Sequence, residues 1–115
     1  MRNYLIEDLI DDHLALIEKH LAEQGYSGSI EDIYYLPVPQ GLLSEEQKLH
    51  FDECGPYFLG LEVIHDLAGN KLKMELLVRA HNKIRCSCVA YCTPPQRNYM
   101  LDFVDDMIKS LDIPV

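Results

Sequence analysis

The sequence predicts an α+β domain in which one antiparallel sheet of about four strands carries an N-terminal and a C-terminal helix on one face. Apolar residues recur at helical spacing near both ends of the chain, and they alternate with other residues at a spacing of two in its middle. Turn residues at 67–70 and 81–83 separate the alternating stretches, which favours hairpins. The expected order is α-β-(α)-β-β-β-α in a single domain over residues 1–115.

The composition is that of an ordinary globular domain. The chain has 115 residues, of which 48% are hydrophobic and 25% charged, and this length suffices for one core. No apolar run approaches the roughly 20 residues that a membrane span requires. Acidic residues enter early, at Glu7 and Asp8, which does not fit a secretion signal. Four cysteines without such a signal are typical of a reducing compartment. We therefore expect a cytoplasmic protein with no membrane contact.

The charge is strongly negative and unevenly distributed. Residues 1–54 hold twelve acidic and three basic side chains, and residues 55–115 hold seven of each, so the first half carries the whole net charge of −9. This balance repels nucleic acid and anionic membranes, and no nucleic-acid partner is expected. A local basic patch nevertheless occurs between residues 71 and 85. Lys73, Arg79 and Arg85 are its candidate contacts for an anionic ligand, and a solvated sheet face is the alternative.

Helices are expected at both ends of the chain. From Asn3 to Gln24 apolar residues repeat at helical spacing, and Gly25 follows as a stop signal. Near the other end Thr93 precedes Pro94 and Gln96, a pattern that caps the start of a helix.

Four stretches are expected to be strands: 30–38, 57–66, 71–80 and 84–92. Prolines restrict the first of them to an edge of the sheet, because proline cannot donate to a ladder. Residues 44–53 are ambiguous. The segment Ser44–Gln47 has the form of a capping box and favours a short helix, whereas the alternation around Phe51 also fits a strand.

A register test assigns the cysteines to the core. If a three-residue turn pairs Ala80 with Ile84, cross-strand partners share the apolar face. A C-x-C pair in an extended strand does not direct both sulfurs to one tetrahedral centre, so no metal site is assigned. Buried cysteine then acts as a small apolar residue. The expected pairs are Cys86 with Val78, Cys88 with Leu76 and Cys92 with Leu72.

The same register exposes the other face of the sheet. It sets Glu62 opposite Glu75 and Arg79 opposite Arg85, and like charges in direct opposition are unfavourable. The middle of this face is also more apolar than contact with water requires, which often marks an interface. The candidate interface residues are Ile64, Leu77, Val89 and Tyr91, and we expect self-association through them or through the edge strand.

No nucleotide-binding, nucleophile-elbow or other catalytic motif occurs, and the recognisable motifs are generic caps and turns. The sequence therefore assigns no enzymatic activity, no cofactor and no family. We expect a small acidic cytoplasmic binding or accessory protein that acts through protein–protein contact as a homodimer, with an unknown protein partner. Two alternatives remain open: an anionic-ligand binder or enzyme that uses the basic sheet face, and a thiol-metal protein that uses the cysteine strand.

Overall fold

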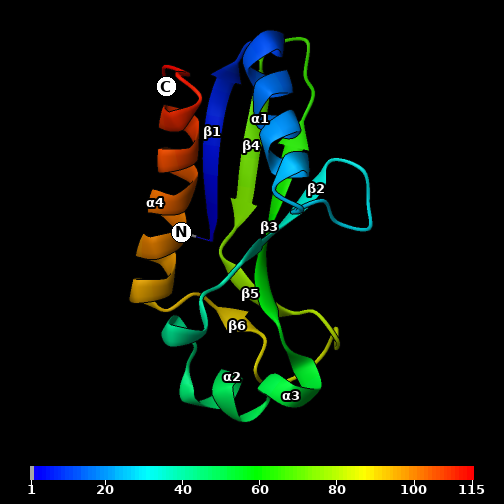
Figure 1. Cartoon of the computed structure of the whole chain (residues 1–115), viewed down its shortest axis with the longest axis vertical. Helices are drawn as coiled ribbons and strands as arrows, with labels where there is room; N and C mark the ends of the chain where they lie inside the picture. The colour runs from blue at the N-terminus through cyan, green and yellow to red at the C-terminus, as the bar shows by residue number, and fades with distance from the viewer. Residues whose placement is uncertain (1) are drawn as a thin grey trace.

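The structure is a computed structural model that describes residues 2–115, and it confirms the α+β class (Figure 1). The described residues form one antiparallel sheet of six strands instead of about four, in the order β1-β4-β3-β5-β6 with β2 paired to β3. None of the helices in this range is long and apolar enough to cross a membrane. In chain order the elements are β1 Asn3–Leu9, α1 Asp11–Glu23, β2 Ile33–Pro37, a 3-10 helix Gln40–Leu42, α2 Glu45–Leu49, α3 Phe51–Cys54, β3 Tyr57–Ile64, β4 Asn70–Glu75, β5 Leu77–Ala80, β6 Ala90–Tyr91 and α4 Pro94–Ser110.

The N-terminal helix is shorter than expected, because residues 3–9 form strand β1 and α1 begins only at Asp11. Apolar residues at positions 6 and 9 fit either a helix or a bulged strand. Pairing decides between them: Ile6 lies opposite Leu72 on the core face of β4, and the register then shifts before Leu9. Asp8 in this bulge has a φ of 59°, which ends the regular strand.

The hairpin of β3 and β4 is shifted by two residues from the expected register. Leu61 pairs with Met74, and both side chains stay on the core face because strands have a period of two. Glu62 consequently lies opposite Lys73 and not opposite Glu75. The expected like-charge opposition is therefore wrong, and an opposite-charge pair takes its place.

The final strand expected at 84–92 is also wrong, because only Ala90–Tyr91 pairs with β5. Arg79 lies opposite Phe58 of β3, not opposite Arg85. The residues between the two strands, which we call the 81–89 loop, leave the sheet and approach α3, where the Asn82 amide donates to the Cys54 carbonyl at 3.0 Å. Cys86 and Cys88 thus lie in a loop, and the expected pairs of Cys86 with Val78, Cys88 with Leu76 and Cys92 with Leu72 do not form.

The core lies between the sheet and the two long helices. Both helices cover the same face, and Tyr26 after α1 meets Phe103 of α4 with ring centroids 6.1 Å apart. The shorter helices α2 and α3 close the end of the molecule next to β5 and β6 (Figure 1). Buried apolar side chains from all these layers include Leu14, Ile17, Leu21, Leu59, Leu61, Leu72, Met74, Met100, Val104 and Ile108.

Two capping boxes expected from the sequence are present and join each other. Ser44 caps α2 with Gln47, which settles residues 44–53 as helical, and Thr93 caps α4 with Gln96. The Gln96 amide donates to the Gln47 side-chain oxygen and to the Leu42 carbonyl, both at 2.9 Å. The two glutamines are buried, so this link ties α4 to the α2 end of the molecule without exposing polar groups.

Replacing Gln96 with alanine is expected to lower the free energy of unfolding by about 2–3 kcal/mol, because it removes a cap and leaves two buried acceptors without donors. Urea denaturation measures the change. Gln24→Ala is the matched control, since this side chain is exposed and its loss should cost less than about 0.5 kcal/mol. Equal effects of the two substitutions would contradict the role of the buried link.

Candidate functional site

The sheet face that the helices leave uncovered is hollowed into a groove of about 960 Å³, which we call the open-face groove. Side chains from β2, β3, β4, β5 and the start of the 81–89 loop line it, together with residues 27–30. Gly60 lies in the middle of β3 and has open space where a side chain would stand. The missing side chain at Gly60 therefore leaves room within the groove.

Aromatic rings form one wall of this groove. Tyr35 of β2 stacks on Phe58 of β3, with centroids 4.2 Å apart and an interplanar angle of 28°. The His81 ring stands edge-on to both, at 6.2 and 6.0 Å. The sequence argument missed this wall, although the alternation of 30–38 already places Ile33 and Tyr35 on one face. Aromatic rings that line a hollow suit the flat or apolar part of a ligand.

The predicted anion contacts are brought together only in part. Lys73 and Arg79 both line the groove, whereas Arg85 lies in the exposed part of the 81–89 loop outside its lining. The Arg79 guanidinium donates to both oxygens of Glu75, at 2.8 and 3.3 Å, and this hydrogen bonding raises the pKa of Arg79. Lys73 makes no salt bridge within residues 2–115, so its ammonium group is available to a ligand.

The predicted interface residues do not form one patch. Leu77 and Tyr91 are cross-strand partners on β5 and β6, and the Arg2 guanidinium lies 3.9 Å from the Tyr91 ring centroid. Val89 packs against the core from the 81–89 loop. Ile64 is opposite Lys71 at the far end of β3. Of the four predicted residues, Leu77 and Tyr91 are thus the two that the sheet brings together.

A second group of reactive side chains meets at the end of the molecule closed by α2 and α3. The ligand atoms of His50, Cys54, Cys86 and Cys88 all lie within 4.8 Å of one another. The His50 Nδ1 atom is 3.0 Å from the Cys86 sulfur. Cys92 lies outside this group, which we call the thiol–imidazole cluster. Its sequence signals are an H-x3-C spacing and a C-x-C spacing, and the second predicts no metal site if residues 84–92 form an extended strand.

The cluster gives its thiols unequal acidities. Burial raises the pKa of Cys54 to about 12. The pKa of Cys86 is lowered to about 6, first because the backbone N–H of Cys88 donates to its sulfur and then because neighbouring side chains do so. Cys86 is therefore the more acidic of these two thiols.

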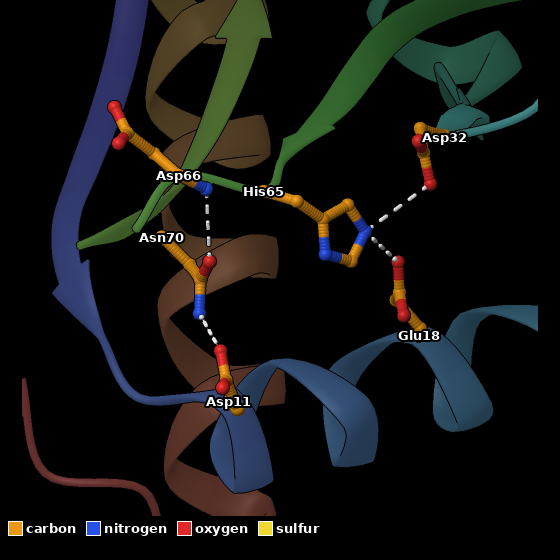
Figure 2. A network of polar contacts seen from close by, with 6 residues as sticks. All are labelled: Asp11, Glu18, Asp32, His65, Asp66 and Asn70. Carbon is orange, nitrogen blue, oxygen red and sulfur yellow. Dashed lines mark hydrogen bonds and ion pairs between the residues drawn. The ribbon is translucent and has the colours of Figure 1, made fainter. Parts of the chain in front are cut away.

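A third polar group lies beside α1 (Figure 2). His65 Nε2 is 3.0 Å from Glu18 and 3.4 Å from Asp32. Next to it, Asn70 donates to Asp11 at 2.8 Å and accepts from the Asp66 amide at 3.1 Å. These contacts fasten the turn between β3 and β4 to α1. The grouping of His65, Glu18 and Asp32 is explained by ion pairing of the histidine with the two carboxylates.

Replacing His65 with glutamine is expected to lower the melting temperature near pH 5.5 and to leave it unchanged near pH 9. Burial by itself lowers the pKa of His65, but the Glu18 and Asp32 carboxylates raise it overall. A raised pKa stabilises the fold below the ordinary histidine value of about 6.5, and this contribution is lost as the pH rises through the raised value.

Because the His65 side chain is 53% exposed, the stabilisation should be at most about 0.5 kcal/mol. Thermal unfolding of both proteins at the two pH values tests it. A difference that is the same at both values would show that the ring contributes by packing and not by charge.

Comparison with known proteins does not assign a family or a function to these sites. No family model, no curated protein and no solved structure matches the chain. The open-face groove and the thiol–imidazole cluster therefore have to be interpreted from their own chemistry.

Proposed function

We propose that the protein is a small binding protein whose site is the open-face groove. The observation that carries this proposal is the stack of Tyr35 on Phe58 in the same hollow as the Lys73 ammonium, which makes no salt bridge within residues 2–115. A ligand with a flat apolar part and an anionic group fits both features, since the rings offer a stacking surface and the ammonium offers a counter-charge.

The charge of the groove supports an anionic ligand in an otherwise acidic protein. Its lining includes Lys73, Arg79 and Lys83 against Glu62 and Glu75, whereas the whole chain has a net charge of −9. Arg79 neutralises Glu75 directly. Four free cysteines also fit a reducing, cytoplasmic environment, where they would escape oxidation.

Substituting Lys73 with glutamine is expected to weaken binding of an aromatic carboxylate or phosphate about tenfold, or ~1.4 kcal/mol. A thermal-shift screen of such compounds identifies a ligand, and calorimetry then measures its affinity. Lys71→Gln is the matched control, because Lys71 lies two residues away on the same strand but outside the groove lining. Tyr35→Leu should weaken binding of aromatic members only.

Two results would contradict the groove as an anion site. One is a screen in which no anionic compound raises the melting temperature. The other is an equal loss of affinity in the Lys71 and Lys73 variants, which would indicate a general charge effect and no specific contact.

A second candidate function is self-association, and the pair of Leu77 and Tyr91 supports it. Tyr91 is 49% exposed although it lies on a strand of the sheet, and short β6 has a free edge in this fold. The free edge of β1 is a poorer candidate, because its bulge and acidic residues blunt it. We therefore place the contact of a homodimer at β5 and β6.

Leu77→Asp is expected to convert the homodimer to a monomer of 13.3 kDa in light scattering, because it buries a charge in the contact. Ile64→Asp is the control at the distant end of β3 and should leave the dimer intact. A wild-type protein that remains monomeric at high concentration would exclude this second function.

A further inference from the structure

The thiol–imidazole cluster joins two segments that are far apart in the sequence. His50 lies between α2 and α3, and Cys54 is the last residue of α3. Cys86 and Cys88 come from the 81–89 loop, more than thirty residues later. The cluster therefore lies at the contact between the α2–α3 segment and the 81–89 loop, which do not pair with each other as strands.

Local structure points each pair of side chains toward the same place. The Cys54 amide donates to the His50 carbonyl at 2.8 Å, which is one helical turn, so both side chains leave α3 on one side. The Val89 amide donates to the Cys86 carbonyl at 3.0 Å, so Cys86 and Cys88 stand within a tight turn and not in an extended strand. The turn removes the geometric objection to a C-x-C pair.

Hydrogen bonds that involve no sulfur hold the two segments at this separation. The Asn82 side chain donates to the Gly55 carbonyl at 2.6 Å, and the Gln47 side chain donates to the Cys88 carbonyl at 3.2 Å. Ser87 donates to Glu46 at 2.8 Å. The four ligand atoms are thus brought together by the fold around them.

From these observations we propose that His50, Cys54, Cys86 and Cys88 form a closed zinc site. Zinc takes four sulfur and nitrogen ligands in a tetrahedron, with Zn–S of about 2.3 Å and Zn–N of about 2.0–2.1 Å, which separates neighbouring ligand atoms by about 3.4–3.8 Å. The four atoms of the cluster already lie within 4.8 Å of one another. Zinc binding would require any separation above this range to shorten and the 3.0 Å between the His50 Nδ1 atom and the Cys86 sulfur to lengthen.

A role as small core residues does not explain why these three cysteines gather around the imidazole of His50. Cys54 and Cys88 are 0% and 1% exposed, yet their sulfurs lie within 4.8 Å of the Cys86 sulfur and of the His50 imidazole nitrogen. Cys92 shows what a packing cysteine looks like in this fold, since it contacts the core and takes no part in the cluster. Three thiols and one imidazole around one point are typical of a structural metal site.

Sulfur ligands also select the metal. Calcium and magnesium prefer oxygen, so they do not fit three cysteines. Four protein ligands leave no open position for water or substrate, which makes the site structural and not catalytic. In the zinc-bound site all three sulfurs are thiolates, so each thiol that is still protonated releases its proton to the solvent, and the neutral imidazole binds through Nδ1.

The proposal is tested on full-length protein purified without a histidine tag under reducing conditions. Elemental analysis is expected to find one zinc per chain. After the metal is removed with a chelator, Co²⁺ should restore the visible bands of a tetrahedral thiolate site, and added Zn²⁺ should remove them. The zinc-free protein should melt at a lower temperature than the zinc-loaded protein.

Matched cysteine variants show whether zinc depends on the cysteines of the cluster or on any cysteine of the chain. Cys88→Ser is expected to reduce zinc content at least tenfold, whereas Cys92→Ser should keep one zinc per chain. If Cys88→Ser does not fold, the Co²⁺ spectrum of the wild-type protein, with its proton release measured at the same time, still decides the question.

Several outcomes would overturn the proposal. They are a reduced wild-type protein that binds neither Zn²⁺ nor Co²⁺, iron in place of zinc, a disulfide within the cluster of the freshly purified protein, or equal zinc loss in the Cys88 and Cys92 variants. Failure of the zinc proposal would leave the groove proposal testable, because its ligand screen can be carried out on the zinc-free protein as well.

Discussion

The arrangement of the molecule depends on hydrogen bonds at one residue, Leu76, where the strand expected over 71–80 is divided. The Leu76 amide donates to the Arg2 carbonyl at 2.9 Å, and its carbonyl accepts from the Cys92 amide at 2.8 Å. The strand segment before Leu76 is thereby fixed to β1, and the segment after it to β6. Both segments still pair with β3, so the sheet continues while its neighbours change. The groove and the 81–89 loop follow from this change of partners.

Patterns that involve near neighbours in the sequence were predicted well. The capping residues of α2 and α4 interact within four positions, so their chemistry is visible without knowledge of the fold. The alternation of β3 and β4 is equally local, and a shift of two residues left every side chain on its expected face. Lys73 and Arg79 were placed on the open face for the same reason.

Features decided by distant pairing could not be predicted in this way. Residues 3–9 fit a helix by spacing, and only the presence of β4 beside them makes a strand more favourable. Tyr35 and Phe58 are separated by more than twenty residues, so their stack depends on the register of β2 against β3. The aromatic wall of the groove was consequently missed, although each residue was placed on a strand.

The cysteines illustrate how one error of local structure changes a chemical conclusion. An extended C-x-C pair cannot direct two sulfurs at one atom, and that reasoning holds for a strand. Asn82 instead directs the chain to α3, and the turn that follows brings Cys86 and Cys88 to His50 and Cys54. Sequence spacing alone contains no signal for this long-range contact.

The 81–89 loop connects the two proposed sites physically. Its first residues, His81, Lys83 and Ile84, line the open-face groove, and its later residues Cys86 and Cys88 belong to the thiol–imidazole cluster. A metal that fastened the later part of the loop would also restrict the earlier part, because only two residues separate Lys83 from Cys86. Restricting a binding wall before the ligand arrives lowers the entropy lost on binding. A structural ion at one end of this fold would thus contribute to recognition on its open face without touching the ligand.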